Sequence, residues 1–355
     1  SGPASARARP ALLHKKDQDM SKTLTAALAL GAPFAILAPS AMAQQTSRLT
    51  WEGEVEIGYE STFDSDLPAN EGDSAYASAE FNGAFALTDS LSIFGGLTFE
   101  ELEDAASNTG YGFYFHELGL QFETGAATFR IGKLHPAFGT AWESAAGFYG
   151  AALAEDYELS EQIGALAEVD LGAAGTLSIG VFYADDTGLS ESIGFNRGRN
   201  STAAGGPGNT GELNNAALQW SKEWDDIFGY VGLRFLSAGV GDVSDETGIV
   251  AGLGHSLGNG LDLFGEVAAF DGYGGTTDDA TYATLNAAYA IGKLTLSGTY
   301  AMRDVTSAGR TDLVSVGAEY ELANGLTLGG ALARLDDAGT EDTMFGVNLV
   351  IPLGG

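Results

Sequence analysis

Apolar and polar residues alternate along most of this chain with a period of two. The clearest stretch is residues 49–60, LTWEGEVEIGYE. This period is typical of a β-strand with one apolar and one polar face. We predict sixteen such strands, at residues 48–62, 74–87, 91–102, 111–123, 127–134, 162–171, 176–185, 213–224, 228–237, 248–257, 261–271, 281–291, 293–303, 312–322, 326–335 and 343–353. After Gln44 no window of eighteen apolar residues occurs, so no membrane-spanning helix is expected.

The connections between these segments alternate between short and long. The short ones are rich in Gly, Asn and Asp, which suit tight turns, and include residues 88–90, 124–126, 172–175 and 258–260. The long polar ones are residues 63–73, 103–110, 135–161, 186–212, 238–247, 272–280, 304–311 and 336–342. We therefore expect short turns at one end of the sheet and long loops at the other.

The apolar face of these strands has no predicted helix to cover it, and aromatic residues lie toward the strand ends. This pattern favours an all-β fold, a transmembrane antiparallel β-barrel of about 16 strands with short turns at one end and long external loops at the other. Closure would pair every backbone group that faces lipid. A secreted β-sandwich or propeller remains the alternative, because hairpin spacing alone resembles it.

The N-terminal region predicts a processed secretory protein. Residues 20–43 combine Lys22, an apolar run over 24–37 and an Ala41-Met42-Ala43 cleavage pattern, as in a signal peptide. Residues 1–19 are interpreted as an upstream extension or an expression remnant. Residues 44–355 are expected to form a single barrel domain.

The charge balance is strongly acidic, with a formal net charge of -32 and no cysteine. Removing residues 1–43 takes five basic and two acidic residues from totals of 16 and 48, which leaves 11 basic residues against 46 acidic ones. Such a chain would repel nucleic acid, so cations are the expected partners.

The chain resembles the trimeric general-diffusion porins of Gram-negative bacteria, most nearly those of alphaproteobacteria. The resemblance covers the architecture from Gln44 onward and includes the local stretch IGKLHPAFG at 131–139. It implies an outer-membrane location and a homotrimer, in contact with outer-membrane lipid and lipopolysaccharide. It also implies that the third external loop folds into the barrel and narrows it. One departure is the C-terminus, where VIPLGG replaces the usual terminal aromatic residue.

Counting strands makes residues 135–161 the third external loop, between predicted strands five and six. This segment carries five aromatic residues and several acids, so we interpret it as an ordered loop; a solvated surface lobe is the alternative. The alternation along the strands predicts that three arginines point into the lumen, where acidic residues of this loop would face them. The candidate constriction is Glu143, Glu155, Asp156, Glu158, Arg130, Arg234 and Arg303. Each arginine could instead form an ion pair with a neighbouring strand. The polar face of the first strand predicts a lumen lining of Glu52, Glu54, Glu56 and Glu60.

No enzyme is predicted, because the histidines His14, His116, His135 and His255 form no metal-binding pair and no GxSxG motif occurs. His135, beside the acidic loop, is interpreted as a loop anchor. No cofactor or ordered metal site is expected. Acidic external loops could hold Ca²⁺ or Mg²⁺ loosely, through Asp64, Asp66, Asp242, Asp245, Glu246, Asp278, Asp279, Asp336, Asp337, Glu341 and Asp342.

Two transport functions stay open at this point. The first is a passive, weakly cation-selective pore for small hydrophilic solutes. The second is a solute-specific channel with a binding site in the lumen, formed by residues such as Tyr230 and Arg234. An adhesin or a barrel enzyme is a further alternative.

Overall fold

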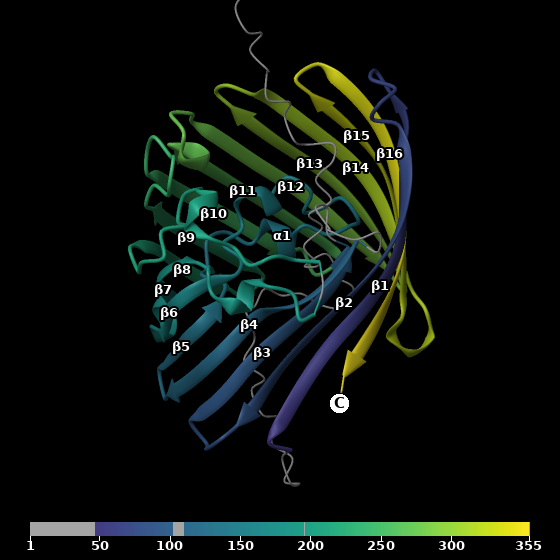
Figure 1. Cartoon of the computed structure of the whole chain (residues 1–355). Helices are drawn as coiled ribbons and strands as arrows, with labels where there is room; N and C mark the ends of the chain where they lie inside the picture. The colour runs from purple at the N-terminus through teal and green to yellow at the C-terminus, as the bar shows by residue number, and fades with distance from the viewer. Residues whose placement is uncertain (1–46, 102–109, 195, 355) are drawn as a thin grey trace, which may run out of the picture.

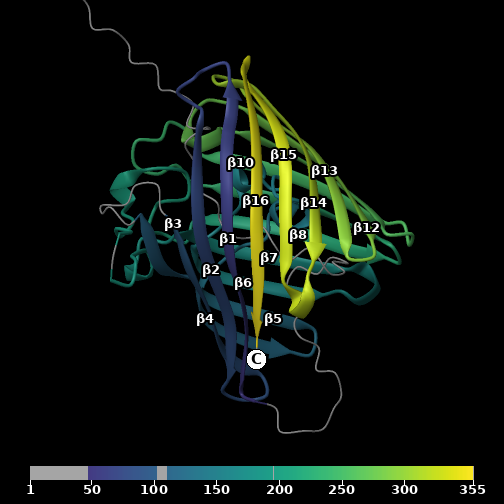
Figure 2. The ribbon, with the colours of Figure 1, turned by 90° about the vertical axis from the view of Figure 1, so that its right-hand side faces the viewer.

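The computed structural model describes residues 47–101, 110–194 and 196–354, and within them sixteen antiparallel strands close into one barrel. Each strand pairs with the next along the chain, and the last strand pairs with the first (Figures 1 and 2). The first eight strands are β1 (Leu49–Ser65), β2 (Gly72–Ala86), β3 (Leu91–Glu101), β4 (Tyr111–Thr124), β5 (Ala127–Leu134), β6 (Gln162–Asp170), β7 (Thr176–Ala184) and β8 (Asn215–Trp224). The others are β9 (Ile227–Leu236), β10 (Glu246–Ser256), β11 (Leu261–Asp271), β12 (Ala280–Ile291), β13 (Leu294–Val305), β14 (Gly309–Glu321), β15 (Thr327–Asp337) and β16 (Thr340–Gly354).

This architecture confirms the predicted all-β barrel. In the described part of the chain, helical structure is confined to short turns: α1 (Ala141–Ser144) and six 3₁₀ segments, η1 (Glu155–Tyr157), η2 (Gly172–Ala174), η3 (Gly188–Ser190), η4 (Thr202–Ala204), η5 (Tyr273–Gly275) and η6 (Ala323–Gly325). No helix among these residues is long and apolar enough to cross a membrane. The segments interpreted as an extension (1–19) and a signal peptide (20–43) lie outside the described residues.

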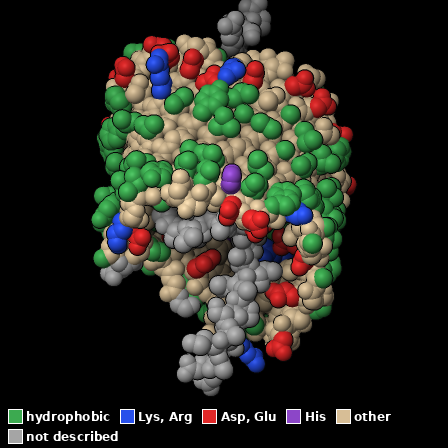
Figure 3. All heavy atoms as spheres, turned by 180° about the vertical axis from the view of Figure 1, so that it is seen from behind, with side chains coloured by type: hydrophobic (Ala, Val, Ile, Leu, Met, Phe, Trp, Pro, Cys, Tyr) green, Lys and Arg blue, Asp and Glu red, His purple; other side chains and the backbone are tan. Residues whose placement is uncertain are grey.

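The two faces of each strand differ as the sequence alternation predicts. On β9, Val231 and Leu233 point outward and are about half exposed, whereas Tyr230 and Arg234 point inward and are buried. Figure 3 shows hydrophobic side chains spread over the outer surface, with acidic side chains near its upper edge. The barrel is thus apolar outside and polar inside, which suits lipid around a water-filled lumen.

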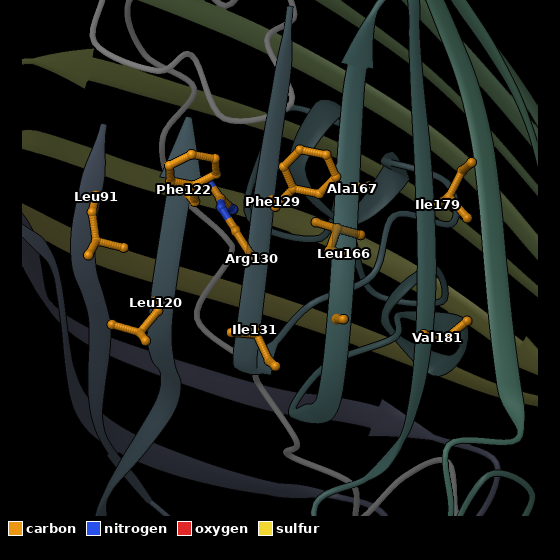
Figure 4. A pocket seen from close by; sticks show the side chains of 11 residues that line it. Leu91, Leu120, Phe122, Phe129, Arg130, Ile131, Leu166, Ala167, Ile179 and Val181 are labelled. Carbon is orange, nitrogen blue, oxygen red and sulfur yellow. The ribbon is translucent and has the colours of Figure 1, made fainter. Parts of the chain in front are cut away.

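The outer wall is hollowed over β3–β7, where small alanines on β6 lie between larger apolar side chains (Figure 4). This depression has a volume of about 480 Å³ and is lined by Leu91, Leu120, Phe122, Phe129, Arg130, Ile131, Ala165, Leu166, Ala167, Ile179 and Val181. Most of these side chains point outward from their strands, so the hollow belongs to the lipid-facing surface.

Two connections are shorter than the sequence suggested. Residues 304–311 and 336–342 were expected to be long polar loops, but the strands continue through them and leave turns at 306–308 and 338–339. The polar residues are cross-strand partners: Thr311 donates to Asp337 at 2.6 Å, and Arg334 pairs with Glu341. Gly309 and Gly339 supply the positive φ that these tight turns need.

β16 closes the barrel. Its residues up to Gly354 pair with β1, and Pro352 lies opposite Glu54. The last strand therefore completes the sheet.

Candidate functional site

The connection at 135–161, which the strand count makes the third external loop, folds into the barrel, as the family resemblance implied. Figure 1 places α1 inside the ring of strands. Phe138 is fully buried, and Trp142 and Tyr157 are almost so. They belong to one cluster with inward-facing apolar residues of β9–β15. The loop is therefore packed against the inner wall and narrows the lumen, and the alternative of an external surface lobe is excluded.

Glu266 on β11 is the main polar anchor of this loop. Its carboxylate is only 2% exposed. It accepts hydrogen bonds from the hydroxyls of Tyr157 and Tyr230 and from the backbone N–H of Thr140, the last at 2.8 Å. The wall and both halves of the loop thus meet at one buried carboxylate.

Gly139 allows this close approach. Its φ is +85°, and a Cβ atom there would lie 2.7 Å from Glu266 Oε2. Because any other side chain would collide with the carboxylate and strain the backbone, glycine is required at this point of the loop.

A second anchor holds the middle of the loop. Asn286 on β12 accepts from the N–H of Ala146 at 3.1 Å and donates to its carbonyl at 2.8 Å. Beyond it, Phe148 lies directly over Gly346 of β16, where a Cβ atom would lie 2.1 Å from the ring. The loop therefore crosses the lumen from β5 to the opposite part of the wall.

Arg234 has a different role from the one expected for a pore-lining charge. It is 7% exposed and pairs with Glu246 of the neighbouring strand β10, at 2.5 Å from Nη2. It donates to the Tyr157 carbonyl at 2.6 Å and lies between the rings of Phe138 and Phe270. This arginine holds the loop to the wall and does not face the water path.

Arg303 is brought together with one predicted loop acid. Its Nη1 lies 3.0 Å from Asp156 Oδ2, which also accepts from the Tyr282 hydroxyl at 3.1 Å. The positive charge from β13 and the negative charge from η1 therefore form a direct pair.

Arg130 is placed among wall residues. Its Nε donates to Gln121 at 2.7 Å, its guanidinium lies 5.6 Å from the centre of the Phe94 ring, and its charge interacts with that of Glu168. These neighbours belong to β3, β4 and β6, not to the loop.

The remaining loop acids differ in exposure. Glu155 is half-buried in η1, and Glu158 lies 3.7 Å from His135 at the base of the loop. Glu143 is open to the lumen. Within the barrel this carboxyl loses part of its hydration, and that loss, followed by the charge of Glu158, raises the pKa of Glu143 to about 7.

The facing wall is also acidic. Glu54 and Glu56 point inward from β1 and are buried, Glu60 is half-buried, and Glu52 is exposed near the start of the strand. Glu56 accepts from Tyr76 at 2.5 Å and from Asn348 at 3.1 Å. The predicted lining of the first strand thus lies on the inner face.

Three further residues of this region were not predicted: Glu80, His116 and Glu117. Glu80 lies 3.6 Å from His116, and Glu143 interacts electrostatically with Glu158, Glu80 and Glu117. The polar parity of residues 78–82 on the second strand could have revealed Glu80. His116 and Glu117 are consecutive residues, and the strand pairing shifts register between Gly96 and Leu97. Because of this shift, the alternation of apolar and polar residues could not predict both side chains.

Several acids considered for loose cation binding have partners within the protein. Asp242 accepts from the N–H groups of Gly206 and Gly239, and Glu246 pairs with Arg234. Among the residues that the structure describes, no group of three histidine or acidic side chains is placed to hold a metal ion.

Comparison with known proteins agrees with this geometry. A family model described as Gram-negative porin matches residues 24–340. No curated protein sequence matches the chain.

Three solved structures illustrate the similarity in fold. The anion-selective porin from Comamonas acidovorans has 15% identity and a TM-score of 0.57, with 86% of this chain and 99% of that chain covered. The outer membrane channel DcaP of Acinetobacter baumannii has 9% identity and a TM-score of 0.63, with 86% and 97% covered. A mutant of the Rh. blastica porin has 14% identity and a TM-score of 0.59, with 86% and 100% covered.

Replacing the anchor should loosen the loop. In Glu266→Ala, two buried hydroxyls and one N–H lose their acceptor, and each unsatisfied buried group costs about 1–3 kcal/mol. We expect noisier single-channel currents and faster proteolytic cleavage within 135–161, with the barrel intact by circular dichroism. The exposed Glu321→Ala is the matched control. Wild-type noise and cleavage rates in Glu266→Ala would show that this carboxylate does not anchor the loop.

Proposed function

Because this chain belongs to the Gram-negative porin family, we propose that it forms a water-filled outer-membrane channel for passive diffusion of small hydrophilic solutes, with a weak preference for cations. The preference for cations is supported by which charged residues are paired with one another. Arg234 and Arg303 pair with acids where the loop docks, whereas Glu143 and Glu158 of the loop face Glu80 and Glu117 of the wall.

The acidic composition supports the same sign. Charges in water act over about 8 Å at physiological ionic strength, so carboxylates on two sides of a narrowed lumen reinforce one another. The Comamonas acidovorans porin is described as anion-selective, but at 15% identity its selectivity depends on other side chains. We therefore derive the sign from this chain's own residues.

The outer surface of the barrel supports a proposal about what surrounds it. The exposed apolar band, which includes Leu233 and Val267, suits outer-membrane lipid. Acidic residues at the external end, such as Asp66 and Asp278, suit loosely held Ca²⁺ or Mg²⁺ next to lipopolysaccharide. The channel family has no enzymatic chemistry, in agreement with the absence of catalytic motifs from the sequence.

The alternative of a solute-specific channel needs a lumen binding site. Tyr230 and Arg234, the residues first considered for it, lie beneath the loop and are 4% and 7% exposed. They anchor the loop and are not available to a passing solute. A specific site would have to use the acidic residues on the open side.

Neutralising two loop carboxylates tests the selectivity. In Glu143→Gln/Glu158→Gln, the cation-to-anion permeability ratio should fall by roughly two- to fivefold, because one charge about 4 Å away in water contributes about 1 kcal/mol. The measurement is the reversal potential across a planar bilayer in a KCl gradient. Glu191→Gln, an exposed residue in the loop 185–214, is the control. An anion-favouring potential in the unmodified protein would refute the proposed preference.

Removing the loop tests whether it sets the narrowest point. A variant without residues 140–158 should conduct more per channel, because this segment occupies the lumen and buries Trp142, Phe148 and Tyr157 against the wall. Single-channel conductance in one salt solution is the measurement. A shortened channel that conducts no better than its parent would place the constriction elsewhere.

A homotrimer is proposed from the family resemblance and the apolar surface where the barrel closes. Trp51 on β1 and Val347 on β16 point outward and are 40% and 44% exposed, with Val55 between them on the same side of β1. Unheated protein should migrate on a detergent gel as a larger species that heating converts to the monomer. A charge placed there, in Val347→Glu, should weaken the trimer, whereas Val231→Glu, an outward position on β9 across the ring from β1 and β16, should not. Wild-type protein that migrates as a monomer in all mild detergents would contradict the trimer.

A further inference from the structure

His135 is the first residue after β5, at the base of the loop 135–161. Its Nε2 lies 3.2 Å from the carbonyl oxygen of His116 on β4. Because a carbonyl oxygen can only accept, Nε2 carries a proton and donates it to this hydrogen bond. The other ring nitrogen, Nδ1, lies 3.7 Å from Glu158 Oε1. In the neutral ring this nitrogen has a lone pair and no proton, whereas a second proton gives it an N–H that can donate to the carboxylate.

The partners of His116 suit a neutral ring. The Asn82 amide donates to Glu80 at 2.6 Å, so its carbonyl oxygen is the atom that faces His116 Nε2 at 2.9 Å. Nε2 therefore donates, and Nδ1 accepts from the hydroxyl of Thr98 at 2.7 Å. Both nitrogens of this buried ring are satisfied without a second proton. Of the two neighbouring histidines, His135 is the one placed to gain a proton.

The two histidines lie in a row that joins the loop to the wall. The row runs from Glu158 through His135 and His116 to Glu80. The two imidazole rings are 5.8 Å apart in an edge-to-face arrangement, and Glu80 Oε1 lies 3.6 Å from His116 Nε2. The side chain of His135 is 24% exposed and that of Glu158 is 13% exposed. Water therefore reaches the His135 ring and can exchange protons with it.

The charged groups around His135 come from each element packed against it. They are Glu143 on α1, Glu158 after η1, Glu80 on β2, Glu117 on β4 and Lys133 on β5. Lys133 is engaged by Glu161 and Asp185, at 2.6 and 3.0 Å. The other groups are the acids to which the cation preference was assigned above. A proton added to His135 thus places a positive charge among the carboxylates of the loop and of the wall.

We propose that His135 is a proton-binding residue that sets the selectivity of the pore. Neutral His135 leaves the surrounding acids to favour cations. Protonated His135 pairs with Glu158 and adds a positive charge near Glu143 and Glu80, so the preference for cations falls as the pH falls. This proposal rests on the channel function above and gives it a control by proton concentration. The proton comes from water and is released again when the pH rises.

Reversal potentials at two pH values test the role of His135. Full-length protein in a planar bilayer is measured in a KCl gradient at about pH 8 and at about pH 5.5, on either side of the ordinary titration range of imidazole. The cation-to-anion permeability ratio should be roughly two- to fivefold lower at the acidic pH, the effect that Coulomb's law gives for one unit charge beside the path in water.

The variant His135→Gln separates the histidine from Glu143, which loses its charge in the same range because its pKa is about 7. The permeability ratio of His135→Gln should match that of the wild type at the higher pH and exceed it at the lower pH, since the imidazolium is missing. If Glu143 alone caused the effect, the ratio of the variant would fall at least as far as that of the wild type.

Two further variants complete the test. Arginine keeps a donor for the His116 carbonyl and carries a permanent charge, so His135→Arg should show at the higher pH the low ratio of the wild type at the lower pH. It tests the site even if His135→Gln distorts the base of the loop. His255 lies opposite the exposed Ile227 and Leu263 near the short-turn end of β10. His255→Gln, the matched control, should behave as wild type at both pH values.

The outcomes distinguish this proposal from the channel function. A cation-selective pore whose permeability ratio does not change with pH, or changes to the same extent in His135→Gln, would refute the role of His135 and leave the proposed function standing. A protein that forms no pore, or one that favours anions at the higher pH, would refute the function itself.

Discussion

The structure depends on the requirement that backbone N–H and C=O groups in lipid be paired. The strands satisfy it by pairing in a closed ring, which β1 on β16 completes. Closure fixes an inside and an outside, and the two-residue period then assigns every side chain to one of them. The lumen and the polar residues within it are consequences of that pairing.

Closure and parity also explain how much could be predicted from the sequence. The strand ranges follow from alternation, since a one-residue slip would turn Leu233 inward and Arg234 toward lipid. The turns at 306–308 and 338–339 were missed because charged residues on strand ends look like loop residues until their cross-strand partners are known. Arg310 of β14, for example, donates to the hydroxyl of Tyr300 on β13 at 2.7 Å.

The candidate site was harder to predict, for a related reason. The alternation along the strand predicts that Arg234 points inward. It does not predict that Phe138 and Tyr157, from a distant segment, cover this arginine. The same limit applies to Glu266, whose three donors come from the loop and from β9. Which part of the inner wall stays open depends on where the loop docks, and no single strand encodes that.

Docking of the loop determines the electrical character of the pore. Each arginine that holds the loop has an acid partner, so its charge is balanced where the loop docks. Removing positive charge from the water path leaves the carboxylates of β1, β2 and the loop's open face to act on solutes. Buried ion pairs are weak evidence of stability, but here they fix position: Glu246 and Arg234 set where Tyr157 lies, and Tyr157 reaches Glu266. In the proposed function, the same contacts that immobilise the loop therefore leave the acidic side to govern permeation.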